Sequence, residues 1–566
     1  MMAMNPAEAL EQAVGHHQAG RLAEAERFYR QVLSVNPNHP DALHLLGMIA
    51  LQTGRLDMAI ELLRRAVATN PGIAEFQNSL GNALNDKGLF DEAIAAFRLA
   101  IRIKPAYAEA HNNLGISLRA NGLLDDAIAA YRQAIRIEPA YAKAHNNLGN
   151  ALRNKGLLDE AVAAYRQALR LTPAFAEAHR NLGNALYDLG QLDECINAYH
   201  RALQLKPDLV EARNSLGTAL RRKGLLDEAI AAYHDAFRMN PEYVGAHENL
   251  AHVLLLKGDF AQGWSEYEWR WKRKDFPSQG RKFLQPRWDG RDLNGRKILL
   301  HAEQGVGDTI QFVRYAPMVA TRGGKVVLEC QPGLCGLLRG VVGIEQVVSV
   351  GELLPDFDVH CPLMSLPLAF NTGLETIPAA IPYLHADETL SRQWAARLGG
   401  PDRLKVGIAW AGSAHHINDR NRSLPASLLS PLAKISGVTF VSLQKGEAAR
   451  KASPPHRQAS ALPRGVNLID HTADLYDFGD TAALIANLDL VISADTAVAH
   501  VAGAIGKAVW VLLPYAPDWR WLLDREDSPW YPTMRLFRQR SLGDWAEVIE
   551  RVAQALDTFV KRENRA

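Results

Sequence analysis

Apolar residues recur through the first half of the chain at the three-and-four spacing of amphipathic helices. Leu114 and Leu118 share one face of a helix, and Ala127, Tyr131 and Ala134 share a face of the next. The arrangement returns every 34 residues, so PAYAEAHNNLGISLRANGLLDDAIAAYRQAIRIEP is followed by PAYAKAHNNLGNALRNKGLLDEAVAAYRQALRLTP. A constant period of this length is typical of a stacked solenoid in which each unit is a helical hairpin.

Two glycines and a proline keep a fixed phase in these units. The first glycine, Gly115 in one unit, suits a close approach between helices, and the second, Gly122, suits a left-handed residue that ends a helix. The proline cannot continue the second helix, and it is expected to open the following one. The prolines that mark the period are Pro37, Pro71, Pro105, Pro139, Pro173, Pro207 and Pro241.

Seven such units are followed by a degenerate eighth, in which Ala251 replaces the first glycine and Gly263 replaces an alanine of the second helix. Bulky aromatic residues come next, at Trp264, Trp269 and Trp271. A terminal unit of this kind is expected to dock onto something other than a ninth repeat.

The positions of Leu114-Gly115, Ala127, Tyr131 and Pro139 resemble the packing positions of the tetratricopeptide repeat, over about half of the chain. The concave wall of such an array is expected to bind a partner. A column of amides there could clamp the backbone of an extended polypeptide acceptor, as the asparagine ladder does in the similar superhelix of protein O-GlcNAc transferases. The alternative is that asparagine is a generic residue of these positions. The candidate acceptor-binding residues are Asn113, Asn147, Asn181 and Asn249, joined one turn on by Asn82, Asn150 and Asn184.

Short runs of β-branched residues and leucine replace the helical pattern from about Lys297. The first set is KILLHA, KVVLE, EQVVSV and FDVH, and the second is KVGIAWA, VTFVSLQ, VNLID, DLVIS and AVWVLLP. Such runs, separated by helical patterns, predict parallel sheets flanked by helices. We therefore expect an all-α superhelical solenoid followed by an α/β region of two doubly wound, Rossmann-like halves. A ligand would sit at the carboxyl ends of the strands, in the crevice between the two sheets.

The changes of pattern give the expected domain boundaries. The repeats are expected to occupy residues 1–271, and a packed connector, rich in proline and tryptophan, residues 272–296. The two halves of the α/β region are expected over residues 297–385 and 386–566.

The amino-acid composition restricts the classes of binding partner and the cellular compartment that we expect. Lys plus Arg number 63 against 62 Asp plus Glu, a balance that argues against nucleic acid and anionic membranes as partners. The four cysteines lack metal-type spacing and are expected to be reduced and mostly buried. No secretion signal opens the chain, and its apolar runs are shorter than the roughly 20 residues that span a bilayer. A cytoplasmic protein with no membrane span is therefore expected.

Candidate catalytic and binding residues lie where the predicted strands end. In AEQGVGDTIQF, Gly305 and Gly307 are expected to let the backbone turn sharply, and Asp308 and Thr309 open a helix. From these residues alone, Asp308 is either an N-cap that satisfies helix amides or a group that takes part in chemistry.

The second set of strands adds two further turns. GIAWAGSAHHINDRNRSLP places Gly412 and Ser413 between a strand and a helix, near Arg422. SADTAVAHVAGAIG places Asp495 and Thr496 after a strand and before a helix of small residues. Helix N-termini and an arginine suit a diphosphate leaving group.

Together these three stretches resemble the heptosyltransferase-like glycosyltransferases, family nine of the sugar transferases, over roughly residues 297–560. The resemblance implies two Rossmann-like halves of the GT-B kind, metal-independent transfer with inversion at the anomeric centre, and a catalytic carboxylate at Asp308. It also implies a nucleotide-sugar site at Asp495, Thr496 and His500, with Arg422 on the phosphate. This chain has NDRNRSLP where the family usually has lysine followed by arginine and tryptophan.

His500 lies one helical turn beyond Thr496 among small residues, so it is either a site residue or a histidine that fills the core. His415 and His416 lie beside Asp419 without a third ligand at metal spacing, so no metal site is expected. No cofactor is expected, since the nucleotide sugar is a substrate.

The sequence thus predicts a glycosyltransferase that moves a sugar from a nucleotide-sugar donor to a hydroxyl of a protein held by the repeats. Asp308 would accept the proton of that hydroxyl. The alternatives are a protein-binding scaffold with an inactive transferase region, and a transferase that acts on a glycan or a lipid-linked acceptor. The residues expected to bind the nucleotide sugar are Gly305, Gly307, Thr309, Gly412, Ser413, Arg422, Asp495, Thr496 and His500.

Overall fold

The computed structural model describes residues 6–273, 283–400, 403–413, 418–445 and 467–563 of the 566-residue chain. The chain divides into two compact units, Met1–Ala219 and Leu220–Ala566, which are described separately. Among the described helices, none combines the length and the apolar character needed to cross a bilayer.

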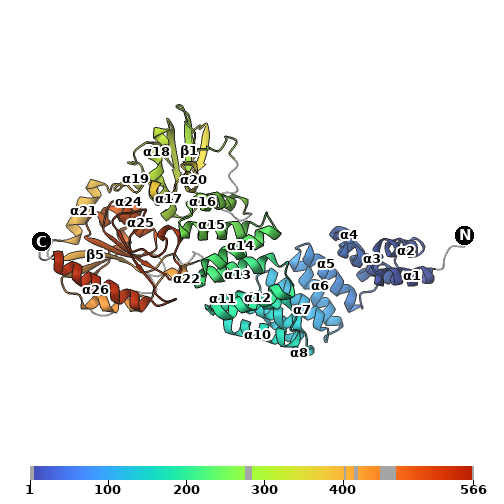
Figure 1. The fold of residues 1–566 in the computed structure, drawn as a ribbon. Helices are drawn as coiled ribbons and strands as arrows, with labels where there is room; N and C mark the ends of the chain where they lie inside the picture. Colours follow the sequence, from blue (N-terminus) through green and yellow to red (C-terminus); the bar gives the residue numbers. More distant parts are fainter. Residues whose placement is uncertain (1–5, 274–282, 401–402, 414–417, 446–466, 564–566) are drawn as a thin grey trace. The chain divides into compact units, whose positions relative to one another are not determined.

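Sixteen helices follow one another through the repeats, in eight successive pairs (Figure 1). They confirm the seven predicted units and the degenerate eighth. Their bounds are α1 (Pro6–Gln18), α2 (Leu22–Val35), α3 (Pro40–Gln52), α4 (Leu56–Thr69), α5 (Ala74–Asp86), α6 (Phe90–Ile103), α7 (Ala108–Ala120), α8 (Leu124–Ile137), α9 (Ala142–Asn154), α10 (Leu158–Leu171), α11 (Ala176–Leu189), α12 (Leu192–Leu205), α13 (Val210–Lys223), α14 (Leu226–Met239), α15 (Val244–Lys257) and α16 (Phe260–Tyr267).

The two glycines of the central repeats have the predicted roles. A methyl group on Gly149 would lie 2.6 Å from the ring of Tyr165, so only glycine allows the two helices of this hairpin to approach so closely. Gly156 has a φ of +82°, a left-handed conformation that ends α9.

The prediction that the proline opens the following helix is wrong. Pro139 comes directly after Glu138, the C-cap of α8, and α9 begins only at Ala142. Its ring therefore ends one helix and lies in the turn before the next, because the first helical position is three residues further on.

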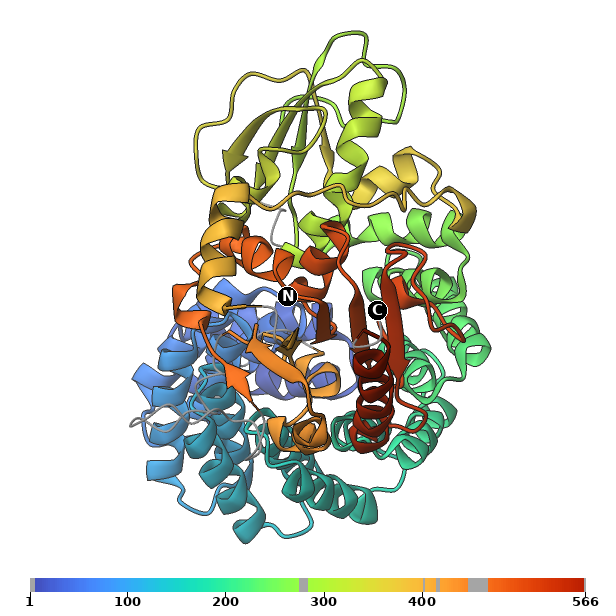
Figure 2. The same ribbon diagram turned by 90° about the vertical axis from the view of Figure 1, so that its left-hand side faces the viewer.

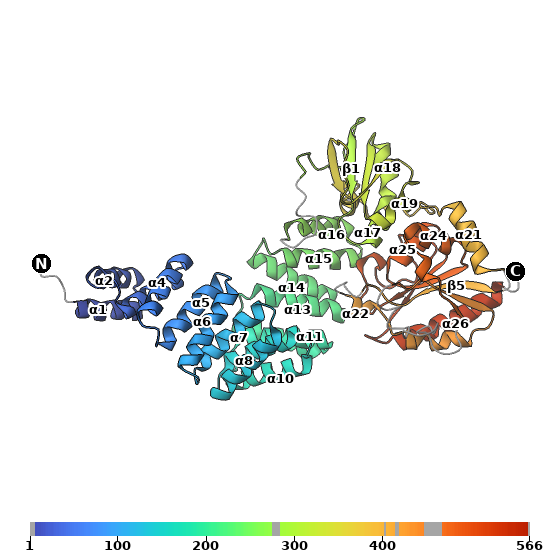
Figure 3. The same ribbon diagram turned by 180° about the vertical axis from the view of Figure 1, so that it is seen from behind.

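Two parallel sheets follow in the second unit (Figures 2 and 3). The first has the order β3-β2-β1-β4, and the second has the order β10-β9-β8-β5-β6-β7. The nine predicted strands are confirmed, and β10 is an addition that the sequence analysis missed. The strands are β1 (Lys297–His301), β2 (Lys325–Cys330), β3 (Ile344–Ser349), β4 (Val359–Pro362), β5 (Leu404–Ala409), β6 (Val438–Ser442), β7 (Leu468–Ile469), β8 (Leu490–Ala494), β9 (Val509–Leu513) and β10 (Met534–Arg538).

Shorter helices surround these strands. The α-helices are α17 (Val306–Phe312), α18 (Ala316–Thr321), α19 (Cys335–Leu338), α20 (Leu366–Ala369), α21 (Glu388–Leu398), α22 (Asp419–Arg422), α24 (Phe478–Ala486), α25 (Ala497–Ala504) and α26 (Trp545–Glu563). The 3-10 helices are η1 (Glu268–Lys272), η2 (Val313–Tyr315), η3 (Pro332–Leu334), η4 (Leu363–Ser365), η5 (Leu374–Thr376), η6 (Ala426–Lys434), η7 (Thr472–Asp474) and η8 (Trp519–Trp521).

The second sheet is covered by helices on both faces, as predicted. Val509 and Val511 of β9 pack with α24 and α25, while Trp510 and Leu512 pack with α26, because successive side chains of a strand point to opposite faces. The first sheet differs. Its buried Leu299 and neighbouring valines pack on Phe283, Leu354 and Phe357, which lie outside any described helix. The first sheet is therefore not doubly wound in its described part.

The last repeat shares a core with the two sheets. Trp264 of α16 is 2% exposed, and its ring stands edge-on to that of Trp519, 5.1 Å away. Its Nε1 donates to the carbonyl of Thr372 at 3.0 Å. The expectation that the eighth unit docks onto another structure is therefore confirmed.

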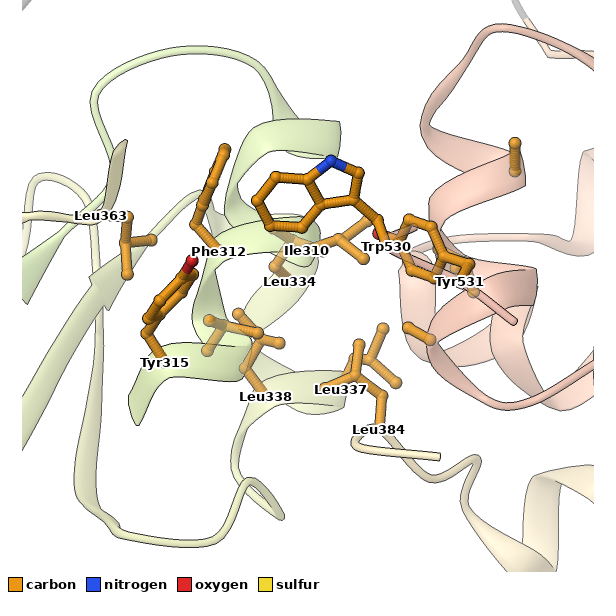
Figure 4. Close-up of a cluster of buried hydrophobic side chains, with 14 of the residues drawn as sticks. Ile310, Phe312, Tyr315, Leu334, Leu337, Leu338, Leu363, Leu384, Trp530 and Tyr531 are labelled. Atoms are coloured by element: carbon orange, nitrogen blue, oxygen red, sulfur yellow. The ribbon is translucent and has the colours of Figure 1, made fainter. Parts of the chain in front are cut away.

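The two sheets meet through a second group of apolar side chains. Figure 4 shows Trp530 and Tyr531, from the region of the second sheet, beside Ile310 and Phe312 of α17. The Phe312 and Trp530 rings lie 5.8 Å apart, edge to face. This packing brings the carboxyl edge of the first sheet against α25, where the candidate site lies.

Candidate functional site

Asp308 lies in the first turn of α17, just beyond the carboxyl end of β1. The N–H of Gly305, the N-cap, donates to Asp308 Oδ2 at 2.8 Å. The predicted helix start is confirmed, but Asp308 is the third helical residue and holds the cap residue from inside the helix. Its carboxylate is 19% exposed.

The two glycines before Asp308 do not have the predicted role in a sharp turn. Gly305 has a φ of −66°, which any residue can adopt. A methyl group on Gly307 would lie 3.1 Å from the His500 ring and 3.7 Å from the Cα of Ala497. A larger residue at 307 would therefore crowd His500, because α17 and α25, from different sheets, lie in contact there.

Arg520, which the sequence analysis did not single out, forms an ion pair with Asp308 through Nη2 and Oδ1. Its Nε donates to Gln311 Oε1 at 2.7 Å, and its Nη1 donates to Asp518 Oδ1 at 2.8 Å. The arginine lies on η8, after the carboxyl end of β9. Sequence reading overlooked it because PDWRWLL has the composition of an aromatic packing segment.

Arg422 lies against the turn that carries Gly412. Its Nη1 donates to the carbonyl of Asp495 at 3.2 Å, and its Nε lies 3.4 Å from Asp419 Oδ1. A methyl group on Gly412 would lie 2.5 Å from Arg422 Nη2. The residues come together because β5 and β8 are neighbours, at the point where the strand order of the second sheet reverses.

Asp495 and Thr496 link β8 to α25, as predicted. Thr496 is the N-cap, but its side chain accepts no capping hydrogen bond, and its hydroxyl lies 3.2 Å from Ser493 Oγ. Burial, together with the charge of Asp518, raises the pKa of Asp495 to about 6, against the opposing effect of Arg422 and Arg520. Asp495 therefore lies within the fields of both arginines.

His500 lies one turn into α25 and is 5% exposed. Its Nδ1 lies 2.9 Å from the hydroxyl of Tyr531, and its ring stacks on Trp521 at 5.7 Å. Burial, with the charges of Arg520 and Arg314, lowers the pKa of His500 to about 3, so the imidazole is neutral at pH 7. His500 therefore fills the core, as one of the two alternatives predicts, and it also contacts the helix of Asp308. Its role at a nucleotide-sugar site stays a prediction.

Thr309 and Ser413, two further predicted nucleotide-sugar residues, have different surroundings. Thr309 is 2% exposed and its hydroxyl donates to Gln331 Oε1 at 2.9 Å, which ties two loops at the edge of the first sheet. A contact from this hydroxyl to a ligand would require that bond to break. Ser413 is exposed and follows Gly412 directly.

The eighth repeat lines the same region. The His252 ring of α15 lies 5.7 Å from that of Tyr267 on α16. Burial and the positive charges of Arg221 and Arg520 lower the pKa of His252 to about 4, although Asp518 opposes them. Tyr267 donates to Gln304 Oε1 at 3.4 Å, one residue before the cap of α17.

The predicted asparagine ladder bonds to itself. Asn113 donates to Asn78 Oδ1 at 3.2 Å, and the corresponding bonds of the next two repeats are equally direct. Asn147 donates to Asn112 at 2.9 Å and Asn181 donates to Asn146 at 3.0 Å. The amide N–H groups therefore join one repeat to the next. Each of these NH2 groups has a second N–H, whereas the side-chain carbonyls of Asn113 and Asn181 accept from Asn112 at 3.1 Å and from Arg180 at 3.3 Å. A peptide clamp would therefore share these amides with the bonds of the array itself.

The remaining predicted residues are Asn249, the four cysteines and two histidines. Asn249 is half-buried on α15, in the second unit. Cys195, Cys330 and Cys361 are buried and Cys335 is half-buried, all as free thiols, as predicted. His415 and His416 lie outside the described residues. Within the described ranges, no group of three or more His, Cys, Asp or Glu could hold a metal ion.

Comparison with known proteins identifies the repeats. Models of the tetratricopeptide repeat match residues 16–82 and 214–267. A further model, described as TPR repeat, matches residues 81–122, 115–156, 149–190 and 183–224. The chain is 28% identical to Protein FlbA of Caulobacter vibrioides over 327 residues. This match covers 53% of the chain and spans about half of the length of FlbA, 53%.

Solved structures match parts of the chain. MamA is 33% identical, with a TM-score of 0.28 over 29% of this chain and 96% of MamA. YrrB, described as a TPR protein with an unusual peptide-binding site, is 20% identical, with a TM-score of 0.28 over 33% of this chain and 96% of YrrB. The residues that the family models match are those that form the helix pairs. The N-terminal half is therefore a tetratricopeptide repeat array, and an α/β region with two parallel sheets follows it.

Proposed function

We propose that this chain is a glycosyltransferase that moves a sugar from a nucleotide-sugar donor to a hydroxyl of a polypeptide acceptor. The observation that carries the proposal is the contact between α17 and α25 at Gly307 and His500. It joins the helix of Asp308, from the first sheet, to the helix that follows Asp495 and Thr496, from the second. A reaction between two substrates needs functional groups from both sheets.

The donor would bind on the second sheet. The strand order reverses between β5 and β8, and ligands of open α/β sheets bind at the carboxyl ends of the strands at such a point. Arg422 lies there between Gly412 and the carbonyl of Asp495. A guanidinium in this position suits the diphosphate of a nucleotide sugar.

The reaction would then divide between the two sheets. The acceptor oxygen forms a bond with the anomeric carbon of the sugar, and the bond from that carbon to the diphosphate oxygen breaks. The hydroxyl proton passes to the carboxylate of Asp308. The nucleotide diphosphate leaves with the negative charge, which Arg422 would stabilise. The protein-binding character of tetratricopeptide arrays supports a polypeptide acceptor.

The test uses the full chain and a panel of nucleotide sugars with uridine, guanosine, adenosine and thymidine bases. Binding is measured by calorimetry and cleavage by release of the nucleotide diphosphate. Acceptors are sought by intact-mass comparison of proteins from cells with and without the gene. Binding and cleavage of one donor would support the proposal, and a protein that neither binds nor cleaves any donor would contradict it.

A second function, a protein-binding scaffold with an inactive α/β region, has one observation in its favour. Asp308 is engaged by both Gly305 and Arg520, whereas a general base must be able to accept a proton. Polypeptide binding without release of any nucleotide diphosphate would favour the scaffold.

A further inference from the structure

Each nitrogen of the Arg520 guanidinium has a defined partner. Nη2 pairs with Asp308, Nε donates to Gln311, and Nη1 donates to Asp518. Asp308 and Gln311 are both on α17, at the first sheet, whereas Arg520 follows β9 of the second sheet. One side chain therefore ties the helix of the candidate base to the opposite sheet.

The orientation of this guanidinium is fixed from other directions as well. Its flat face lies over the ring of Trp519, 4.3 Å from the centroid, and Arg520 is 8% exposed. The backbone N–H of Arg520 donates to Asp518 Oδ1 at 3.1 Å, so the same carboxylate holds both its main chain and its side chain. A planar fork with donors in fixed directions can make these contacts together, and a lysine ammonium cannot.

The carboxylate of Asp308 is held at both oxygens as a result. Oδ2 accepts from Gly305 at 2.8 Å, and Oδ1 pairs with Arg520. An ionised carboxylate can accept about four hydrogen bonds, and donors on both of its oxygens fix its direction. We propose that Arg520 is the positioning residue that orients the Asp308 carboxylate toward the acceptor hydroxyl, a role that rests on the function proposed above.

The polar and charged groups around Asp308 set the electrostatic environment to which Arg520 adds a positive charge. Gln311 lies on the same helix, Tyr267 approaches from α16, His500 lies behind Gly307 on α25, and Asp518 lies beyond Arg520. Arg520 is the cation in direct contact with the carboxylate. A neighbouring cation lowers a carboxylate pKa by about 1–3 units, so its removal should move the acidic limb of the rate profile to higher pH.

The experiment compares Arg520→Lys and Arg520→Gln with Arg314→Lys in the full-length protein. Arg314 is a matched control because it is also buried and also bridges toward the second sheet, donating to the carbonyl of Trp530 at 2.6 Å. We expect Arg520→Lys to lower kcat by about 100-fold, as small displacements of a reacting group do, with the donor KM within about threefold. Arg520→Gln should move the acidic limb upward by about one pH unit or more. Arg314→Lys should lower Tm and leave the limb in place.

Gln311→Leu covers the case in which the Arg520 variants do not fold. It removes one contact of the guanidinium and keeps its charge, so kcat should fall while the acidic limb stays where it is. Wild-type kcat and pH profile in Arg520→Lys, or in Gln311→Leu, would overturn the positioning role. An equal shift of the limb in Arg314→Lys would overturn it too, because the shift would then come from loosening of the sheets. A wild-type protein that cleaves no donor overturns the proposed function itself, before any variant is compared.

Discussion

The side-chain amide of Asn147 donates to the side-chain carbonyl of Asn112, 35 residues earlier, at 2.9 Å. The same bond joins Asn181 to Asn146 and Asn113 to Asn78. Amides that line an array can thus serve its own stability before they meet any partner. The ladder fixes how each repeat lies on the one before it.

Replacing Asn113, Asn147 and Asn181 with alanine should therefore destabilise the array as well as weaken binding of a polypeptide acceptor. Each substitution leaves a partner amide without its donor, so we expect a combined loss of about 2–4 kcal/mol in the free energy of unfolding. Thermal unfolding and acceptor titration measure the two effects. Asn154→Ala, at an exposed position of α9, is the control and should be close to neutral. Unchanged stability of the triple variant would show that the ladder bonds contribute little.

Thr496→Val should lower donor affinity and leave stability nearly unchanged. Thr496 is the N-cap of α25, yet its side chain makes no capping bond, and the contact that its hydroxyl makes is with Ser493 Oγ at 3.2 Å rather than with the helix amides. Calorimetry with the donor and thermal unfolding measure the two quantities. Asp387→Ala is the contrasting variant, because Asp387 does cap α21 by accepting from Leu390 at 2.8 Å and should cost about 1 kcal/mol. A large fall in Tm for Thr496→Val with unchanged donor affinity would count against the donor site.

Asp308→Asn should abolish most transfer while donor and acceptor still bind. Asparagine can accept from the Gly305 N–H but cannot take a proton at neutral pH, so we expect a rate loss of about 10²–10⁴-fold. Because the partner Arg520 is mostly buried, the variant should also unfold at a somewhat lower temperature. Single-turnover transfer and donor titration separate chemistry from binding. Turnover within a few-fold of the wild type would remove Asp308 from the mechanism.

Asp495→Asn should gain stability relative to the wild type as the pH rises from about 4 to 7. Burial raises the pKa of Asp495 from 3.8 to about 6, so the folded state binds the proton more tightly than the unfolded state does. The stabilisation from this group is complete below pH 4 and is lost as the pH rises through 6. Asparagine stays neutral and avoids that loss. Chemical denaturation at several pH values measures the difference, and a gap that moves in favour of aspartate with rising pH would contradict it.

The repeats were predictable because each of their determinants is local. Gly149 and Tyr165 lie 16 positions apart, and the same contact returns at Gly81 and Phe97, Gly115 and Tyr131, and Gly183 and Tyr199. Strands such as β8 and β9 were predictable because a strand buried on both faces has a continuous apolar run. The missed strand β10, MRLFR, lies at the edge of its sheet, and two arginines break up its apolar run.

The site was only partly predictable. Gly305, Asp308, Asp495 and Thr496 carry a local signature, a strand followed by a polar turn and a helix. Arg520 carries none, because its partner lies 212 residues away and the contact exists only once two sheets have folded and met. The bonding of the asparagines to each other also escaped sequence reading, because periodic spacing is the same whether amides face a ligand or one another.

The edge-on contact between Trp264 and Trp519 limits which repeats can be exchanged by recombination between such chains. A cut that removed α15 and α16 would expose the apolar surface that Leu255, Phe260 and Trp264 now cover. Recombination that grafts a new array onto this α/β region should therefore succeed only where the last hairpin travels with the sheets. The seventh hairpin also reaches this region, since Arg222 of α13 donates to Asn421 Oδ1 at 3.2 Å. Repeats nearer the N-terminus, whose asparagines bond to the neighbouring repeats, should be gained, lost or exchanged more readily. Natural variation in array length should thus fall upstream of this hairpin, which would be inherited with the α/β region.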